Sequence, residues 1–577
     1  MLTTHFQRVL ALFLFSGLAS LLGGCHESQD GQDGQESLKN TVISPQIDSA
    51  RLSETVRVLA SDEFYGRAPG GPGEALTVNY LIERFTELGL EPAGEQGGWT
   101  QSVPLIHTQI VAPADTAPVL RLNTDGATRT LVQGTEVEFS STRAVERAVI
   151  DDAPIVFVGH GAFAPERSWD DFGNIDLRGK LAVFLVNDPD FAAVAGEAVA
   201  GRFGGKRMTY YGRWTYKFEE AARRGALAAL VVHDDAGAGY GWNVASSSPG
   251  ENYSIERPAD SLAPPLLQGW LHNDAARDLF ALAGLSLEEQ RQLARAEDFE
   301  AFELEGVTLS AALEIEMEVV QSQNVLARLK GSTRPEESIL VSGHWDAYGV
   351  GEPDSQGRTV RPGANDDALG IAGVIELARV LSTGKSPERS VVFAAWTAEE
   401  SGLLGSEAYA SQPLFPLETT VANFTLDILQ TAGLARDVIQ VGEGQSELEQ
   451  DLARAAALQG RTVTPENLPE NGLFFRADHF SLARRGVPVL LIMGIAGGAD
   501  LVEGGRAAGD KWIADYTGNC YHQTCDAWSP EWDLRGAVQD IELFQSIITD
   551  LANSSRWPEL LPSSEFKSIR DESRHLR

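Results

Sequence analysis

The sequence has few basic residues, little cysteine and, after its N-terminal region, no long apolar run. Lys and Arg number 46 against 82 Asp and Glu in 577 residues, which gives a formal net charge of −36. Such a surface repels polyanions, so we do not expect nucleic acid or anionic membrane surfaces as partners. No later segment is apolar enough to span a bilayer. We therefore expect a soluble body, long enough for at least two domains.

The N-terminus has the pattern of an export signal. Arg8 precedes an apolar run over residues 9–22, followed by Gly23-Gly24-Cys25, which resembles a bacterial lipobox. We predict a lipoprotein signal peptide over 1–24 and a flexible tether over 25–44, with a lipid on Cys25 as the only link to the membrane. An ordinary secretory signal is the alternative. The expected location is outside the cytoplasmic membrane, in a bacterial cell envelope.

The two remaining cysteines, Cys520 and Cys525, bracket His522. Export permits a disulfide between them. A zinc site with thiolate ligands is the alternative, but it needs more Cys or His nearby than the sequence supplies. We favour the disulfide, which would stiffen the loop that presents His522.

Apolar patterning after residue 338 predicts a doubly wound α/β fold. Strands are expected at 339–342, 391–396, 421–426 and 487–493, and helices at 369–381 and 538–551. Earlier in the chain, helices are expected at 51–59, 75–88 and 217–225, and strands at 153–158, 180–186 and 226–233. Beyond Trp557 the chain becomes polar, so we expect a frayed end and a polar tail over 561–577.

Several residues with metal-binding or acid–base chemistry follow these strands or precede a helix. They are His344, Asp366, Asp367, Glu399, Glu400 and Asp427, and His522 lies further along the chain. Open α/β sheets build their sites outside the carboxyl ends of their strands, so these side chains are expected to converge. Two histidines and three carboxylates suit a pair of zinc ions, and one further glutamate suits a general base.

The chemistry also indicates roles for neighbouring residues. A metal-bound imidazole commonly donates its second N–H to a carboxylate, and Asp346 lies two residues from His344. The adjacent Glu399 and Glu400 point in different directions, so one can bind metal while the other accepts a proton from water.

Five short motifs together resemble the secreted di-zinc aminopeptidases, a family that also includes glutamate carboxypeptidase-like and transferrin-receptor-like proteins. The motifs are residues 60–67, 343–346, 363–367, 399–406 and 521–522. The resemblance covers roughly residues 45–130 and 315–557, and it implies a mixed sheet of the zinc-aminopeptidase (phosphorylase/hydrolase-like) type.

The resemblance also implies two Zn²⁺ per chain and a division of roles among the site residues. His344 and Asp427 would hold one zinc, Glu400 and His522 would hold the other, and Asp366 would bridge the two. Glu399 would be the general base, and Asp346 would orient His344.

In the same family, a β-rich protease-associated domain is often inserted, and residues 136–305 resemble one. The insert would divide the peptidase domain into a first part over 45–135 and a second, catalytic part over 306–560. The aromatic and basic run at 210–217 would contact substrate or serve domain packing.

Two segments depart from the family pattern. Residues 476–480 resemble its Ser-Asp-His loop, with Ala477 in place of serine, and we interpret Asp478 and His479 as pocket-shaping or structural rather than catalytic. Leu429 and Gln430 replace smaller residues after Asp427, a change that affects the shape of the pocket more than metal binding.

The resemblance predicts a metallo-exopeptidase that removes N-terminal residues from peptides with a free N-terminus. Glutamate carboxypeptidase-like and glutaminyl-cyclase-like activities are alternatives on the same fold. A carboxypeptidase needs a cationic pocket for the substrate's C-terminal carboxylate, and the sequence does not place one. A non-catalytic surface binding protein is the remaining alternative, which retention of all five ligands and Glu399 argues against.

Overall fold

The computed structural model describes residues 46–112, 118–246, 250–257 and 262–576. The chain divides into two units, 1–44 and 45–577. The predicted signal peptide, tether and lipidation site at Cys25 lie outside the described residues. In the described part of the chain, no helix combines the length and the apolar character needed to cross a membrane.

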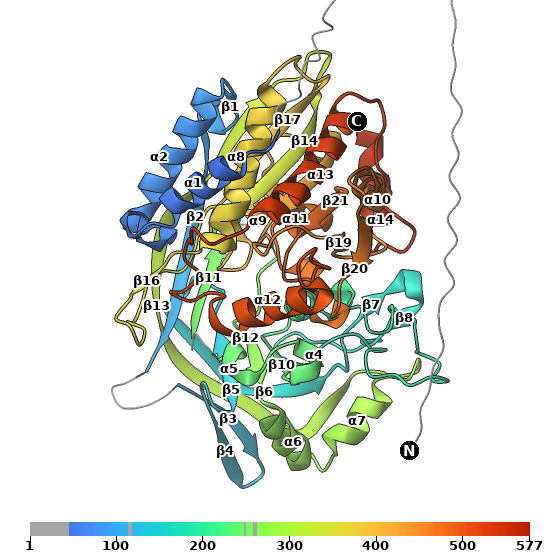
Figure 1. The fold of residues 1–577 in the computed structure, drawn as a ribbon. Coiled ribbons are helices and arrows are strands. Elements are labelled where there is room, and N and C mark those ends of the chain that lie inside the picture. Colours follow the sequence, from blue (N-terminus) through green and yellow to red (C-terminus); the bar gives the residue numbers. More distant parts are fainter. Residues whose placement is uncertain (1–45, 113–117, 247–249, 258–261, 577) are drawn as a thin grey trace, which may run out of the picture. The chain divides into compact units, whose positions relative to one another are not determined.

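A large mixed sheet organises residues 45–577 (Figure 1). The half that carries the predicted site residues runs in the order β21-β18-β14-β17-β13. The bounds are β13 Phe302–Leu329, β14 Arg334–His344, β17 Arg389–Trp396, β18 Thr420–Leu426 and β21 Val489–Ile492. Neighbours among β21, β18, β14 and β17 pair in parallel, whereas β13 pairs antiparallel with β17. Parallel pairing aligns the carboxyl ends of these four strands at one edge of the sheet.

Helices cover both faces of this half of the sheet, because alternate strand residues pack into two different cores. On β17, Val391 and Phe393 belong to one core, and Val392 and Ala394 belong to the other. The first core includes residues of α1 Ser49–Leu59, α2 Pro72–Glu87, α8 Leu369–Ser382, α10 Leu448–Leu458 and α13 Arg535–Ala552. The second includes residues of α9 Leu404–Ser411 and α11 His479–Ala483. The predicted doubly wound α/β arrangement is confirmed.

The long strand β13 carries the sheet into a second region. Its first part pairs with β6 Arg147–Phe157 and β3 Val119–Thr124, and its later part pairs with β2 Thr100–Val111 and β17. Beyond β6 the sheet continues through β9 Leu181–Leu185, β10 Ala228–Val232, β12 Leu267–Leu271 and β5 Val137–Ser140. Helices α3 Trp214–Arg223, α6 Asn273–Leu282 and α7 Leu287–Leu293 belong to the same region.

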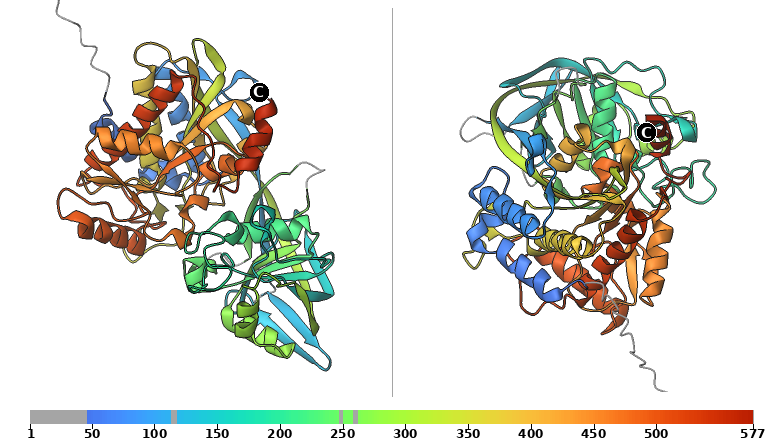
Figure 2. Two further views of the ribbon diagram at one scale, coloured as in Figure 1. Left: turned by 90° about the vertical axis from the view of Figure 1, so that its right-hand side faces the viewer. Right: turned by 90° about the horizontal axis from the view of Figure 1, so that it is seen from above.

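This second region has a hydrophobic core of its own. The core draws on residues from Ile110 to Ile315, a wider range than the 136–305 expected for an insert. In the left view of Figure 2, the cyan and green segments gather at one end, away from the blue and red helices that cover the main sheet.

The end of the chain corrects one expectation. Residues 561–577 were expected to fray as a polar tail, but α14 Lys567–Ser573 packs against the body of the protein. Phe566 and Arg570 are only 4% and 2% exposed. The Arg570 guanidinium donates to the carbonyl oxygen of Thr420 at 2.8 Å, at the start of β18. This buried arginine and its apolar neighbour fix the segment.

Candidate metal centre

The carboxyl ends of three parallel strands bring the predicted site residues together. His344 is the last residue of β14, Glu399 and Glu400 lie in the turn after β17, and Asp427 directly follows β18. Asp366 lies in the turn Ala364–Ala368 that leads into α8. The sequence predicts these strand-end positions, because each of these polar residues lies at or just beyond the end of an apolar strand.

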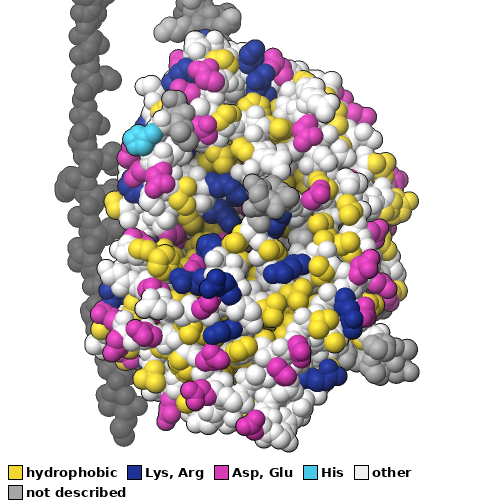
Figure 3. Space-filling model, turned by 180° about the vertical axis from the view of Figure 1, so that it is seen from behind, with side chains coloured by type: hydrophobic (Ala, Val, Ile, Leu, Met, Phe, Trp, Pro, Cys, Tyr) yellow, Lys and Arg dark blue, Asp and Glu magenta, His cyan; other side chains and the backbone are white. Residues whose placement is uncertain are grey.

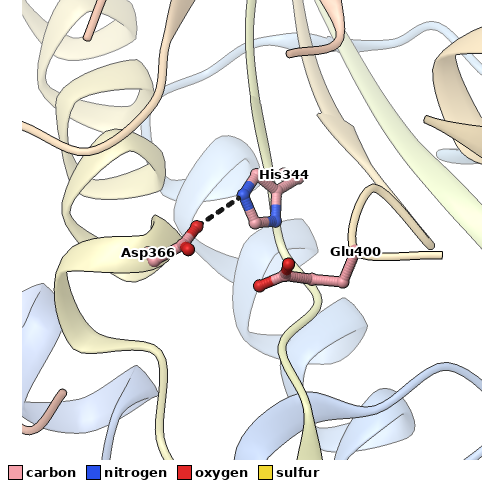
Figure 4. A group of neighbouring side chains, drawn as sticks. All are labelled: His344, Asp366 and Glu400. Carbon is pink, nitrogen blue, oxygen red and sulfur yellow. Dashed lines mark hydrogen bonds and ion pairs between the residues drawn. The ribbon is translucent and has the colours of Figure 1, made fainter. Parts of the chain in front are cut away.

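Asp366 lies between the two predicted histidine ligands. Its Oδ1 is 3.1 Å from Nε2 of His344, and its Oδ2 is 3.3 Å from Nε2 of His522. Glu400 Oε2 lies 3.4 Å from the same nitrogen of His522. Figure 4 shows Asp366 and Glu400 on either side of the His344 ring. A carboxylate with one oxygen toward each histidine has the geometry required to bridge two cations.

Two sets of ligand atoms lie close enough to share an ion. One set is His344, Asp366 and Glu400, and the other is His344, Glu399 and Asp427, with atoms within 4.8 Å of one another. The second set includes the expected pair His344 and Asp427. His522 is in neither set and joins the centre through Asp366 and Glu400. The structure therefore brings all the predicted residues together without separating them into the two expected pairs.

The donor atoms fit a divalent cation. Oε1 of Glu400 and Nε2 of His522 are buried without hydrogen-bond partners. Burial and, to a lesser extent, the charge of Asp366 together raise the pKa of Asp427 to about 8. Burial also raises the pKa of Glu399 and Glu400 well above the usual range. A cluster of buried carboxylates whose oxygen atoms lack partners destabilises the fold unless a cation binds there. Imidazole nitrogens and carboxylate oxygens are ligands that zinc accepts.

Asp346 supports both the histidine and the glutamates. Nδ1 of His344 lies 3.2 Å from the backbone oxygen of Asp346 and 3.6 Å from its carboxylate. The carboxylate also accepts from the backbone N–H of Glu399 at 3.1 Å and of Glu400 at 3.4 Å. Asp346 thus lies where the prediction requires it and, in addition, fixes the turn that carries both glutamates.

Two further residues hold the centre and had no role in the sequence-based prediction. Arg67 is fully buried and donates to the carbonyl oxygens of Trp345 at 2.8 Å and Gly363 at 2.8 Å. The Asp526 carboxylate accepts from the backbone N–H of Asn365 at 3.0 Å and of Asp366 at 3.1 Å. Arg67 is the last residue of the motif at 60–67, on which the family resemblance partly rests, so the sequence did point to this residue. Asp526 belongs to no motif that we used.

The loop that carries His522 is closed by a disulfide. Cys520 and Cys525 are bonded to each other, which confirms the favoured prediction and contradicts a thiolate zinc site at these residues. His522 has a positive φ of 62°, which is unusual for a residue with a side chain. A pocket opens beside it and is also lined by Tyr348, Arg361 and Asp366.

Asp478 and His479 are both buried next to the site. Oδ1 of Asp478 and both ring nitrogens of His479 lack hydrogen-bond partners. Burial raises the pKa of Asp478 to about 7, and His344 opposes this rise, so their charges interact. The His479 ring packs against Phe474 with centroids 4.9 Å apart. This packing accords with a pocket-shaping role, which stays a prediction.

The aromatic run at 210–217 packs between the two regions of the sheet. Tyr210 has ring contacts with Phe480 at 5.0 Å and Phe475 at 6.0 Å, both in the catalytic region. These contacts favour the packing alternative for Tyr210 over contact with substrate.

Fold and site together define a candidate metal centre on an α/β sheet, and the known proteins that this chain resembles include zinc peptidases. Residues 324–544 match the model of Peptidase family M28. A probable zinc metalloprotease of Pyrenophora teres f. teres is 43% identical over 91 residues, which are 16% of this chain and 19% of that protein. Aminopeptidase NAALADL1 of Mus musculus is 32% identical over 129 residues, covering 21% of this chain and 16% of that protein.

These sequence matches are local: the chain spans less than a fifth of the length of each curated relative named here. Among solved structures, an aminopeptidase from Aneurinibacillus sp. strain AM-1 aligns over 89% of this chain and 96% of its own, with a TM-score of 0.46 and 19% identity. The zinc aminopeptidase BSAP from Bacillus subtilis aligns over the same 89% and over 96% of its own chain, with a TM-score of 0.40 and 16% identity.

Proposed function

We propose that this protein is a zinc-dependent exopeptidase that hydrolyses the peptide bond after a free N-terminal residue. The observation that carries the proposal is the position of Asp366, with one carboxylate oxygen toward His344 and the other toward His522. The match of residues 324–544 to a peptidase family supports hydrolysis, and the names of the relatives support zinc and aminopeptidase activity.

Five residues would hold two Zn²⁺ ions: His344, Asp366, Glu400, Asp427 and His522. Zinc supplies Lewis-acid chemistry, because it polarises a carbonyl group and makes water more acidic. The remaining chemistry belongs to side chains. Asp346 accepts the backbone N–H of Glu399 at 3.1 Å, which fixes the turn that presents the Glu399 side chain.

Glu399 is the general base in this proposal. Its Oε2 lies 3.9 Å from Nε2 of His344, so it faces the centre. The carboxylate accepts a proton from the attacking water and then delivers it to the departing amine. Glu400, which follows directly in the chain, binds metal instead, because the turn directs the two side chains differently.

Two further parts of the proposal concern regions outside the centre. We propose that the region around residues 136–305 is a protease-associated domain that limits substrate access, which its separate hydrophobic core supports. We also propose that Cys25 is lipidated and holds the protein at the outer side of the cytoplasmic membrane. Release of the full-length mature protein from membranes by high salt alone would count against the lipid.

The decisive experiment compares zinc-restored protein on aminoacyl amides and on the same substrates with a blocked N-terminus. We expect cleavage of the free amines only, and a loss of kcat of about 100-fold or more in Glu399→Gln. Glu531→Gln, which removes an exposed carboxylate elsewhere, is the matched control. Cleavage of blocked substrates, or full activity of Glu399→Gln, would refute this mechanism.

A further inference from the structure

Arg213 and Arg476 carry positive charge that nothing in the described part of the chain neutralises. Arg213 is only 7% exposed, and its Nε has no hydrogen-bond partner. Within the described residues, neither guanidinium forms an ion pair with a carboxylate. This is unusual in a protein with 82 acidic and 46 basic residues, where most buried arginines can find an acidic partner. Figure 3 shows that Lys and Arg side chains also gather near the middle of one hollowed face of the molecule.

The contacts that hold the two arginines leave most of their N–H groups free. The Arg213 guanidinium lies 5.7 Å from the ring centre of Trp214, and that of Arg476 lies 5.4 Å from the ring centre of Tyr240. Aromatic faces attract cations but accept few directed hydrogen bonds. Within the described residues, the one hydrogen bond of these two guanidinium groups is a long one, from Nη2 of Arg476 to the carbonyl oxygen of Ala238 at 3.5 Å.

The two arginines also act on each other. Burial and, to a lesser extent, the charge of Arg476 together lower the pKa of Arg213 to about 9. Two like charges that are removed from water destabilise the folded state unless an anion binds between them. Arg476 and Tyr240 are partly exposed, so a ligand can reach the pair.

One loop connects this pair to the candidate metal centre. A side chain at Gly472 would come within 3.5 Å of Cδ of Arg213, so the loop passes directly beside that arginine. The same loop continues through Arg476 into α11. There Ser481 accepts a hydrogen bond from Ser406 of α9 at 2.9 Å, and α9 follows the turn that carries both glutamates of the centre. The cationic pair therefore lies along the loop that borders the centre. Arg213 comes from the other region, at the start of α3.

We propose that Arg213 and Arg476 together bind a carboxylate of the peptide substrate, on the side of the scissile bond away from the free amine. The inference rests on the proposed exopeptidase function and specifies its substrate class. Guanidinium groups match the planar geometry of a carboxylate and bind it through paired N–H donors. The carboxylate is the C-terminal one of a short peptide or the side chain of an acidic residue.

The test measures binding without turnover. Zinc-loaded Glu399→Gln protein is titrated by calorimetry with Leu-Gly and with its C-terminal amide, and then with Leu-Glu-amide and Leu-Gln-amide. The first pair tests the C-terminal carboxylate and the second tests an acidic side chain. We expect at least one acid to bind about tenfold or more tightly than its neutral partner, since charge-assisted hydrogen bonds are the strong ones. Equal affinities within both pairs would overturn the proposal.

Variants then assign the preference to the two arginines. Arg476→Met and Arg213→Met should each reduce the acid-to-neutral affinity ratio to about one third or less of its original value. Arg213→Lys keeps the positive charge but loses the paired N–H donors of the guanidinium, so its acid-to-neutral affinity ratio should be intermediate. Arg178→Met removes an arginine whose side chain is 80% exposed, and it should keep the full ratio.

The outcomes separate this proposal from the proposed function. Arg213 is buried, so if its methionine variant does not fold, the partly exposed Arg476 decides the question. An undiminished acid preference in Arg476→Met would overturn the carboxylate site. Failure of the zinc-loaded wild-type protein to hydrolyse any substrate would refute the proposed peptidase function. The acid-to-neutral affinity ratio would still show whether the two arginines bind a carboxylate.

Discussion

The phenol oxygen of Tyr348 lies 2.9 Å from Nδ1 of His522, on the opposite side of the ring from Asp366. The two rings are also in contact, with centroids 4.5 Å apart. An Nδ1–H group that donates to Tyr348 leaves the lone pair of Nε2 free for a metal. Partners of this kind fix the tautomer and the orientation of ligating histidines.

Tyr348→Phe should therefore weaken zinc retention without unfolding the protein. The loss of an outer partner of a metal ligand typically costs about tenfold or more in affinity, and we expect a change of that order. Competition with a chromophoric chelator measures it. Tyr65→Phe is the matched control, because Tyr65 is 46% exposed and lies outside the centre. Equal zinc affinity in the Tyr348 variant and wild type would contradict this role.

The disulfide between Cys520 and Cys525 should stabilise the presentation of His522. The bond closes a loop with a sequence separation of 5 and holds a histidine with φ of 62°. Closing so short a loop is worth about 2 kcal/mol in the chain-entropy model. Cys520→Ser/Cys525→Ser should melt at a lower temperature and lose zinc to a chelator faster than wild type. A reductant is the control, because it should affect wild type but not the double variant. Unchanged zinc loss in the double variant would show that the loop keeps its conformation without the disulfide.

Replacing Arg67 should destabilise the whole catalytic region. Its guanidinium donates to four buried carbonyl oxygens, those of Leu59, Trp345, Pro362 and Gly363. Arg67→Met leaves these acceptors without their donor, so we expect a loss of about 3 kcal/mol or more in urea unfolding. Arg57→Met, on the exposed face of α1, should leave the urea midpoint close to that of wild type. A small effect at Arg67 would mean that water replaces its hydrogen bonds.

The sequence predicts the catalytic half of the fold because its strands are short, apolar and separated by amphipathic helices. The same strands locate His344, Glu399 and Asp427, since a ligand just beyond a buried strand must lie at the edge of the sheet. Asp366 was located by its position just before α8, whereas the convergence of His522 with it rested on the family resemblance. Their structural neighbour Asp526 was missed because its partners are backbone N–H groups, which leave no pattern in the sequence.

Other parts could not be predicted for equally physical reasons. β13 runs unbroken from Phe302 to Leu329, so no turn residue marks the passage from one core to the other. The C-terminal segment is polar on average, which hides the two residues that anchor it, Phe566 and Arg570. The pair Arg213 and Arg476 is separated by most of the insert and half of the catalytic region, and only the folded chain brings it together.

Glu138 should make stability depend on pH in the region away from the metal centre. The side chain is 7% exposed, and its Oε1 accepts from Gln133 at 2.9 Å and from the backbone N–H of Gly250 at 3.0 Å. Burial raises its pKa to about 7. Between its ordinary pKa of about 4.3 and about 7, the native state holds a proton that the unfolded chain has released. Stability from this group is therefore lost as the pH rises through that window, and it stays low above pH 7.

Glu138→Gln cannot release a proton, so its melting temperature should rise relative to wild type between pH 5 and pH 8. Glu146→Gln removes an exposed carboxylate from the same region, and its difference from wild type should stay constant over that range. A constant difference for Glu138→Gln as well would show that Glu138 is already ionised in the native protein at pH 5.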